Sequence, residues 1–152
     1  MLDILRVILH EWSIAEGIVT VLLESFKDQK VLEVEIKIGE LRDLNIEVLG
    51  EALSILSKGT SLEDSRFSIV VSKAVFKCLS CGERWMMDKA LEILSGTLDA
   101  DKYVIEEGEP EPPVHFIPSL IVGLQRCPSC GRIDIETESG KELEISRVYL
   151  SQ

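Results

Sequence analysis

Apolar side chains near the start of the chain recur at a helical spacing. The recurring positions, four residues apart, are Ile14, Ile18, Leu22 and Phe26. This period places them on one face of a helix, and Ala15, Val19 and Leu23 widen that face. We therefore expect a helix from His10 to about Lys27 that covers a core with its apolar side.

The next two segments predict a strand and a second helix. The first alternates apolar and charged residues, and its apolar members are Leu32, Val34, Ile36 and Ile38. This period of two is typical of a strand with one buried and one solvated face, and Gly39 ends it. Asn45 is a suitable N-cap for a helix, and Gly59 lies just past its expected end. The apolar face of this helix consists of Ile46, Leu49, Leu53 and Leu56.

The middle of the chain is less regular. The segment from about Phe67 to Phe76 predicts a strand that runs directly into Cys78. Residues 89–94 predict a short helix, and residues 119–124 predict another. Residues 106–113 contain the run Glu-Pro-Glu-Pro-Pro, which neither a helix nor a central strand accepts, so we expect an exposed loop there.

Composition and charge narrow the class of protein. The chain has 152 residues, 45% hydrophobic and 28% charged, which is ordinary for a folded soluble protein. Its formal net charge is −11, and its Lys and Arg residues are scattered rather than gathered in a stripe. Because phosphate neutralisation supplies most of the affinity for nucleic acid, we expect no nucleic-acid partner. The apolar residues 1–9 are too short to span a bilayer and lack the features of a secretory signal, so we expect a cytoplasmic protein without a membrane partner.

All four cysteines fall into two pairs of the form Cys-x-x-Cys-Gly. The pairs are Cys78-Leu79-Ser80-Cys81-Gly82 and Cys127-Pro128-Ser129-Cys130-Gly131. Two cysteines at this spacing bend around one side of a metal ion, and the glycine supplies the positive φ that turns backbone N–H groups toward sulfur. We predict one tetrahedral site of four thiolates, which suits Zn(II) and leaves no open coordination position. Such a closed site is structural rather than catalytic.

Other interpretations of the cysteines remain open. A redox pair of the thioredoxin kind would start a helix, and helical periodicity follows neither pair. Iron is the stronger rival, because Cys-Pro-x-Cys-Gly with Trp85 near the first pair resembles rubredoxin, an electron-transfer protein. Rubredoxins are much shorter than this chain, and a compact aromatic core joins their two cysteine pairs, which the segment between the pairs lacks here. A zinc-ribbon interaction module is the third possibility, although the acidic charge speaks against nucleic acid as its partner.

These segments together predict an α+β fold. Two helices pack on a small mixed sheet, and a zinc-ribbon-like lobe is inserted into this first lobe. Leu143, Ile145 and Val148 mark a final strand that returns to the first sheet. The predicted domains are residues 1–76, completed by a C-terminal strand at about 133–150, and residues 77–132.

Four motifs in order resemble the HypA family of nickel metallochaperones, which serve the maturation of nickel–iron hydrogenases. They are His10-Glu11-Trp12-Ser13-Ile14-Ala15, Gly39-Glu40-Leu41 and the two cysteine pairs. The resemblance covers about Leu9 to Val148, and the order of the motifs is more specific than any one of them. The long insert with His115-Phe116-Ile117-Pro118 resembles archaeal members in particular.

The resemblance implies a nickel site at the start of the chain. Family members begin Met-His-Glu, and the terminal amine, the amide nitrogen of residue two and its imidazole chelate Ni(II) in a square plane. By this resemblance His10 is the ligand and Glu11 is the adjoining acidic residue. This sequence departs from the pattern, because nine residues precede His10 and Leu9 stands in place of Met. We hypothesise that translation starts at Leu9 as an initiator methionine; with the extension present, binding through the His10 imidazole would be weaker.

The remaining candidates are assigned by the same resemblance or by elimination. His115 is the only other histidine, and it is a further candidate nickel ligand if the insert folds back toward His10. Glu40 is expected to shape a turn or to support a neighbouring site residue, and not to act as a catalytic acid, and Trp12 is expected to pack in a core. We find no Ser/His/Asp set and no phosphate-binding loop, so we expect a metal carrier and not an enzyme. The implied partners are a HypB-type GTPase and the precursor of the hydrogenase large subunit, and a homodimer is possible.

Overall fold

The computed structural model describes residues 2–97 and 125–152, and the predicted segments at 106–113 and 119–124 lie outside the described residues. The chain forms two compact units. The first unit consists of Met1–Ile38, Asp43–Val71 and Glu142–Gln152. The second consists of Gly39–Arg42 and Ser72–Lys141, and it is thus inserted into the first along the chain. The predicted α+β class is confirmed.

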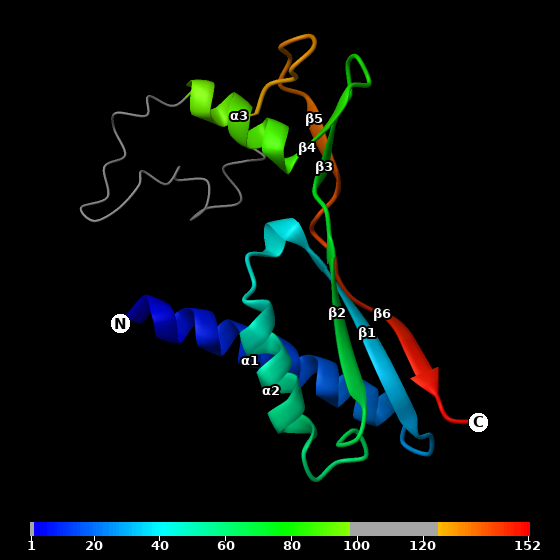
Figure 1. The fold of residues 1–152 in the computed structure, drawn as a ribbon. Helices are drawn as coiled ribbons and strands as arrows, with labels where there is room; N and C mark the ends of the chain where they lie inside the picture. Colours follow the sequence, from blue (N-terminus) through cyan, green and yellow to red (C-terminus); the bar gives the residue numbers. More distant parts are fainter. Residues whose placement is uncertain (1, 98–124) are drawn as a thin grey trace. The chain divides into compact units, whose positions relative to one another are not determined.

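The first unit packs two helices on one three-stranded sheet (Figure 1). Its elements are α1 (Leu2–Ser25), β1 (Val31–Gly39), α2 (Ile46–Ser57), β2 (Arg66–Ser72) and β6 (Leu143–Leu150). The strand order is β2-β1-β6, and β6 runs antiparallel to β1. Both helices contribute to one core with β1, and Leu22, Ile36 and Leu53 are almost fully buried in it. Burial of these aliphatic side chains is the main force that holds this unit together.

The first helix begins earlier than its periodic pattern predicts. We expected a start at His10, whereas α1 extends from Leu2 over 24 residues, so His10 lies inside the helix. The predicted boundary was wrong because it was drawn from amphipathic periodicity. Residues 2–9 are apolar and show little such periodicity. Among the described residues, no helix combines the length and apolarity needed to cross a membrane.

One prediction about β1 is wrong because the strand carries an irregularity. Strict alternation predicted that Leu32 is buried, whereas its side chain is 47% exposed and Val31 is 3% exposed. The register against β6 shifts between Val31 and Glu33. A shift of one residue turns the preceding side chains to the opposite face, so Val31 takes the core position. Val34, Ile36 and Ile38 follow the predicted alternation and are buried.

The second helix begins as its capping residue predicts. The side chain of Asn45 accepts a hydrogen bond from the backbone N–H of Val48 at 3.1 Å. This bond satisfies one of the N–H groups that have no partner within the first turn of a helix. Gly59, with φ +73°, follows the C-cap residue Lys58, so the predicted end is also confirmed.

The second unit contains a three-stranded antiparallel sheet and one helix. Its elements are the short 3-10 helix η1 (Glu40–Arg42), β3 (Val75–Cys78), β4 (Arg84–Met86), α3 (Met87–Thr97) and β5 (Ile135–Ser139). The strand order is β4-β3-β5. The predicted single strand from Phe67 to Phe76 is divided into β2 and β3, which belong to different sheets. The predicted strand region at 133–150 is likewise divided, since β5 pairs with β3 and only β6 joins the first sheet.

The core of the second unit is small and contains two aromatic rings. Phe76 and Trp85 lie with their ring centroids 6.2 Å apart, and Ala90 and Leu94 of α3 complete the cluster. The indole N–H of Trp85 donates to Oε1 of Gln125 at 2.6 Å, in a position where both side chains are buried. A buried indole needs such an acceptor, so Gln125 completes the core rather than interrupting it.

The Gly39-Glu40-Leu41 motif fixes a close approach of two chain segments within the second unit. A Cβ atom on Gly39 would lie 2.0 Å from the carbonyl oxygen of Gly140, so only glycine fits there. The N–H of Leu41 donates to the same carbonyl at 2.8 Å. The carboxylate of Glu40 accepts from the N–H of Ala74 at 2.8 Å. Glu40 therefore anchors the chain just before β3, in agreement with a turn-shaping role.

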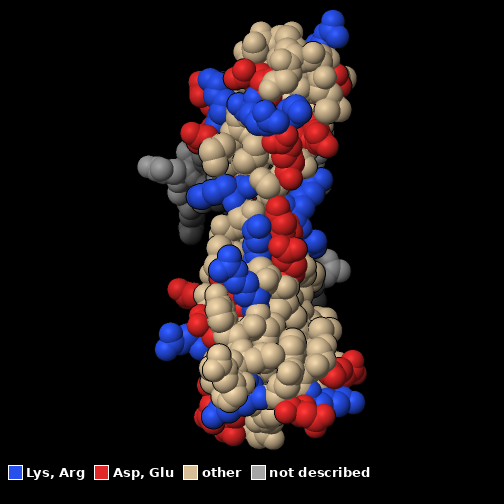
Figure 2. All heavy atoms as spheres, turned by 90° about the vertical axis from the view of Figure 1, so that its right-hand side faces the viewer, with Lys and Arg blue, Asp and Glu red and all other residues tan. Residues whose placement is uncertain are grey.

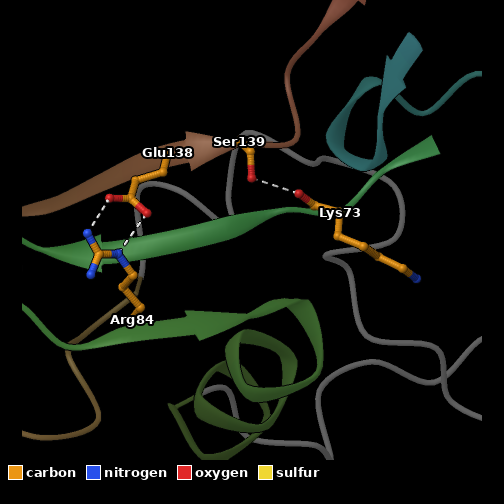
Figure 3. A network of polar contacts seen from close by, with 4 residues as sticks. All are labelled: Lys73, Arg84, Glu138 and Ser139. Carbon is orange, nitrogen blue, oxygen red and sulfur yellow. Dashed lines mark hydrogen bonds and ion pairs between the residues drawn. The ribbon is translucent and has the colours of Figure 1, made fainter. Parts of the chain in front are cut away.

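Polar contacts also connect the two outer strands of the second sheet (Figure 3). The guanidinium of Arg84 on β4 bonds both carboxylate oxygens of Glu138 on β5, at 2.9 and 3.1 Å. The neighbouring Ser139 hydroxyl donates to the carbonyl of Lys73 at 2.9 Å. The Arg84 hydrogen bond lowers the pKa of Glu138, and the carboxylate in turn raises the pKa of Arg84. On the face that Figure 2 shows, the described Lys and Arg side chains are interspersed with Asp and Glu and form no basic stripe.

Candidate metal centre

The four cysteines of the second unit converge on one point. The Sγ atoms of Cys78, Cys81, Cys127 and Cys130 all lie within 4.8 Å of one another. The Sγ atoms of Cys78 and Cys130 are 3.6 Å apart, and those of Cys81 and Cys127 are 3.5 Å apart. Four sulfurs bound at about 2.3 Å to one tetrahedral ion lie about 3.8 Å from each other. The sulfur positions therefore fit a four-thiolate Zn(II) site, and the predicted grouping of the two pairs is confirmed.

Two nearly equivalent turns of backbone position the sulfurs. In the first, the N–H of Cys78 donates to Glu83 at 2.8 Å and the N–H of Gly82 donates back to Cys78 at 2.9 Å. In the second, Cys127 donates to Arg132 and Gly131 donates to Cys127 at the same two distances. Gly82 and Gly131 have φ of +81° and +75°, a conformation that residues with a Cβ rarely adopt. The glycines of the motif are thus explained by backbone geometry.

Backbone N–H groups favour the ionised form of one sulfur in particular. The Sγ atom of Cys127 accepts from the N–H groups of Ser129 and Cys130, each at 3.4 Å. Burial of Cys127 opposes ionisation, but these hydrogen bonds outweigh it and lower the pKa of the Cys127 thiol to about 7. A thiol must lose its proton to bind a metal, so the N–H groups of Ser129 and Cys130 favour the form of Cys127 that coordinates.

Within each turn the first cysteine is buried and the second is exposed. Cys78 and Cys127 are buried, whereas Cys81 and Cys130 are exposed. Beside them, the Ser80 hydroxyl bonds the carboxylate of Asp134, and the N–H of Leu79 donates to the Asp134 carbonyl at 2.9 Å. The hydrogen bond from Ser80 lowers the pKa of Asp134. These contacts join the first turn to the segment that follows the second turn, so hydrogen bonds as well as a bound metal would hold the two turns together.

The residues predicted to bind nickel belong to the first unit, apart from one that is not described. His10 is on α1 with an exposed side chain, whereas Glu11 is 1% exposed. Oε1 of Glu11 accepts the backbone N–H of Asn45 at 2.9 Å, and Oε2 is buried without a hydrogen-bond partner among the residues that the structure describes. His115 lies outside the described residues. Within the described part of the chain, the four cysteines are the sole cluster of three or more His, Cys, Asp or Glu ligands.

Two side chains near these sites carry roles that the sequence pattern did not reveal. Gln125 accepts the indole N–H of Trp85 just before the second cysteine turn. Glu11 contacts the first residue before α2, which is 34 positions away in sequence. Both contacts are non-local, and no spacing rule identifies them. The one signal in the sequence concerned Glu11, which is a charged residue beside Trp12 on an otherwise apolar helix face.

Known proteins with similar sequences cover almost the whole chain. The family described as "Hydrogenase/urease nickel incorporation, metallochaperone, hypA" matches residues 9–150. The hydrogenase maturation factor HypA of Thermococcus sibiricus is 32% identical over 143 residues, covering 92% of this chain and 95% of the relative. The factor of the same name from Pyrococcus horikoshii is 31% identical over 147 residues, covering 95% of this chain and 97% of the relative.

Solved structures with a similar fold carry the same family name. The solution structure of the nickel metallochaperone HypA from Helicobacter pylori superposes with a TM-score of 0.51 at 14% identity, covering 92% of this chain and 96% of that one. A second solution structure of a HypA protein gives a TM-score of 0.56 at 16% identity, covering 94% and 97%. At these identities the likeness supports the fold, while the family match rests on the sequence. The chain belongs to the HypA family of nickel-incorporation metallochaperones.

Proposed function

We propose that this chain carries Ni(II) as exchangeable cargo and delivers it to the large subunit of a nickel–iron hydrogenase during maturation. The observation that carries the proposal is the match to the HypA family over residues 9–150, together with a four-sulfur site suited to a resident zinc ion. The zinc would fix the second unit, since four protein ligands leave no position for a substrate. The nickel must therefore bind at a site other than the four cysteines, and the resemblance assigns His10 as a ligand of that site.

Exposure of His10 suits release of the metal. Its imidazole is on the surface of α1, where a recipient has access to it. Imidazole nitrogen is a good ligand for Ni(II), and a site with few protein donors exchanges its metal readily. The backbone N–H of a residue inside a helix donates to the carbonyl four residues earlier. In this structure the helix continues through His10, so the amide nitrogen of His10 is engaged in a helical hydrogen bond and only its imidazole is left to bind the metal.

Glu11 supports the nickel site from within the first unit. Its Oε1 holds the N–H of Asn45, which fixes the part of α1 that carries His10 against the start of α2. Its Oε2 is buried and has no hydrogen-bond partner among the described residues, so we assign the carboxylate a supporting role near the metal through its negative charge. Glu11→Gln keeps an acceptor for Asn45 and removes the charge. We expect this variant to keep the stability of the fold within about 1 kcal/mol and to bind nickel more weakly; unchanged nickel affinity would remove Glu11 from the site.

Titration of nickel into zinc-loaded protein tests the assignment of His10. Three forms are compared: the chain from residue 1, a chain that begins with Met at position 9, and His10→Ala. We expect the tightest binding for the start at residue 9, where amine, amide and imidazole chelate together, and the weakest for His10→Ala. Ser13→Ala, an exposed change on the same helix, serves as the control. Equal affinity in all three forms would refute both His10 as ligand and the expected contribution of a terminal amine beside it.

The partners and the cellular setting complete the proposal. A HypB-type GTPase would act with this chain, and the hydrogenase large-subunit precursor would receive the metal. Neither step requires this chain to catalyse a reaction, so we propose a carrier without enzymatic activity. Its four thiols, arranged for a metal, suit the reducing conditions of the cytoplasm. His115→Ala tests whether the insert adds a nickel ligand, since it would lower nickel affinity only if that imidazole binds.

A further inference from the structure

The four sulfurs of the cysteine cluster differ in their access to solvent. Cys81 and Cys130 are exposed, whereas Cys78 and Cys127 are buried. Each turn therefore contributes one accessible sulfur and one covered sulfur. Small oxidants attack cysteine as its thiolate, and they react first at sulfurs that solvent reaches. Because a metal holds its cysteine ligands as thiolates, Cys81 and Cys130 are the positions at which an oxidant meets the cluster.

Each exposed sulfur is in contact with a buried sulfur of the other turn. The Sγ atoms of Cys81 and Cys127 are 3.5 Å apart, and those of Cys130 and Cys78 are 3.6 Å apart. A disulfide has an S–S distance of about 2.05 Å, so closing either contact requires the sulfurs to approach by about 1.5 Å. An oxidised sulfur in one turn thus has a partner for a disulfide in the other turn.

Contacts that do not involve a metal hold the two turns side by side. Strand β3 pairs with β5 as far as Cys78 and Ile135, where the first turn begins. The N–H of Leu79 donates to the carbonyl of Asp134 at 2.9 Å, and the Ser80 hydroxyl bonds the carboxylate of the same aspartate. The turns are therefore still adjacent at the moment when a ligand sulfur is oxidised, and the second sulfur is in position to react.

We propose that the cluster is an oxidant-sensitive site, in which a peroxide joins the two turns through disulfides between Cys81 and Cys127 and between Cys78 and Cys130. The disulfides release the zinc ion and take over its role as the link between the turns. Under reducing conditions such bonds are transient, which is typical of redox-sensing thiols. The proposal concerns the zinc-loaded chain and does not depend on nickel or on the proposed function.

Each disulfide consumes one peroxide. The Cys81 thiolate attacks one oxygen of hydrogen peroxide, so an S–O bond forms, the O–O bond breaks, and the departing hydroxide takes up a proton to become water. The Cys127 thiolate then attacks the Cys81 sulfur, so the S–S bond forms, the S–O bond breaks, and a second hydroxide leaves and becomes water with another proton. Two electrons pass from the sulfurs to the peroxide. The two thiolates that remain are too few for a closed zinc site.

A bond between the turns has a different consequence from a bond within one turn. Cys81 and Cys127 are 46 positions apart, so a disulfide between them closes a long loop and restricts the unfolded chain. A disulfide between Cys78 and Cys81 would close a short loop inside one turn and leave the two turns unconnected. We therefore expect the oxidised, zinc-free second unit to stay folded under conditions in which the reduced, zinc-free unit unfolds.

Peptide mapping of the oxidised chain tests the proposal. Zinc-loaded, nickel-free full chain is treated with hydrogen peroxide, and zinc release is followed with a chromogenic chelator. Trypsin cuts after Lys and Arg, so each turn leaves in a peptide of its own, residues 78–84 and residues 127–132. We expect peroxide to release zinc about tenfold faster, or more, than buffer alone. Without reductant the two peptides should stay linked, and fragmentation should place the bonds at the two contacts between the turns.

Two further measurements separate the thiols from other effects of peroxide. Met86 is 45% exposed and is itself a target for oxidation, but it lies in a different tryptic peptide. Met86→Leu is the matched control and should release zinc at the same rate as the natural chain. In a Trp12→Phe variant, Trp85 emission should stay close to its zinc-loaded position after oxidation. The same emission should shift to longer wavelength after chelation under reducing conditions.

Any of the following results would overturn the proposal. Zinc retained at peroxide concentrations that oxidise Met86 would do so, as would zinc release that Met86→Leu abolishes. Disulfides confined to single turns, or sulfinic or sulfonic acid at the cysteines in place of disulfides, would do so as well. Linked peptides that come from a covalent dimer on a non-reducing gel would assign the bonds to two copies instead. A shift of Trp85 emission as large after oxidation as after chelation would show that disulfides do not replace zinc as the link.

Discussion

Removal of zinc is expected to unfold the second unit and to leave the first unit folded. The described core of the second unit has three large buried side chains that are not cysteine: Phe76, Trp85 and Leu94. At 1.5–3 kcal/mol for each, they contribute about 5–9 kcal/mol. A structural zinc ion contributes about 10–16 kcal/mol to a small domain. Because the metal contributes more than these side chains together, the second unit should not persist without it.

Removal of zinc should leave the first unit folded. Its core contains ten buried side chains larger than alanine, and none of its described residues belongs to the cysteine cluster. At the same value for each side chain, burial contributes about 15–30 kcal/mol to the first unit. For both units these sums are upper estimates. The contrast between the units, and not either absolute sum, is what the prediction uses.

One tryptophan in each unit allows the two responses to be measured separately. Trp12 belongs to the first unit, and Trp85, which is 6% exposed, belongs to the second. In a Trp12→Phe variant the remaining emission comes from Trp85 and should shift to longer wavelength when a chelator removes the zinc. In a Trp85→Phe variant the emission of Trp12 should not change. Unshifted Trp85 emission after release of one equivalent of zinc, or an equal shift of both residues, would refute the reasoning.

Three further changes test individual contacts. Asn45→Ala removes the cap of α2 and should lower the free energy of unfolding by about 1 kcal/mol in urea titration; an unchanged midpoint would contradict it. Gly39→Ala places a Cβ against the Gly140 backbone and should strongly destabilise the second unit by the Trp85 signal, whereas Gly50→Ala should stabilise slightly. Arg84 lowers the pKa of Glu138 in the folded state, so the pair stabilises the fold fully above the ordinary carboxyl pKa of 4.5. This stabilisation is lost as the pH falls through the lowered pKa of Glu138. The stability difference between the natural chain and Arg84→Met should therefore be present near neutral pH and absent in acid, and a difference that persists in acid would contradict this sign.

Local patterns predicted the parts of the structure that local chemistry decides. The spacing of the cysteines and the glycine after each pair were sufficient to predict the four-sulfur site, because each turn is closed by hydrogen bonds within six consecutive residues. The side chain of Asn45 bonds an N–H three residues away, so its role as a cap was readable as well. Alternation along β1 was readable for the same reason.

Other features depend on partners distant in sequence and were not predictable from periodicity. The exposure of Leu32 results from a register shift against β6, more than a hundred residues later. The division of the predicted strand between Phe67 and Phe76 follows from which sheet each half joins. The burial of Glu11 is decided by its contact with Asn45. Each of these required the assembled fold.

The central claim is that this chain holds two metals in two ways, zinc permanently and nickel exchangeably. The most direct test loads the protein with zinc, equilibrates it with Ni(II), treats it with a mild chelator such as free histidine, and counts both metals at each step. The account predicts one retained zinc throughout, and nickel that is bound first and then removed by the chelator. Nickel that displaces the zinc from the cysteine cluster, or zinc-loaded protein that takes up no nickel, would contradict it.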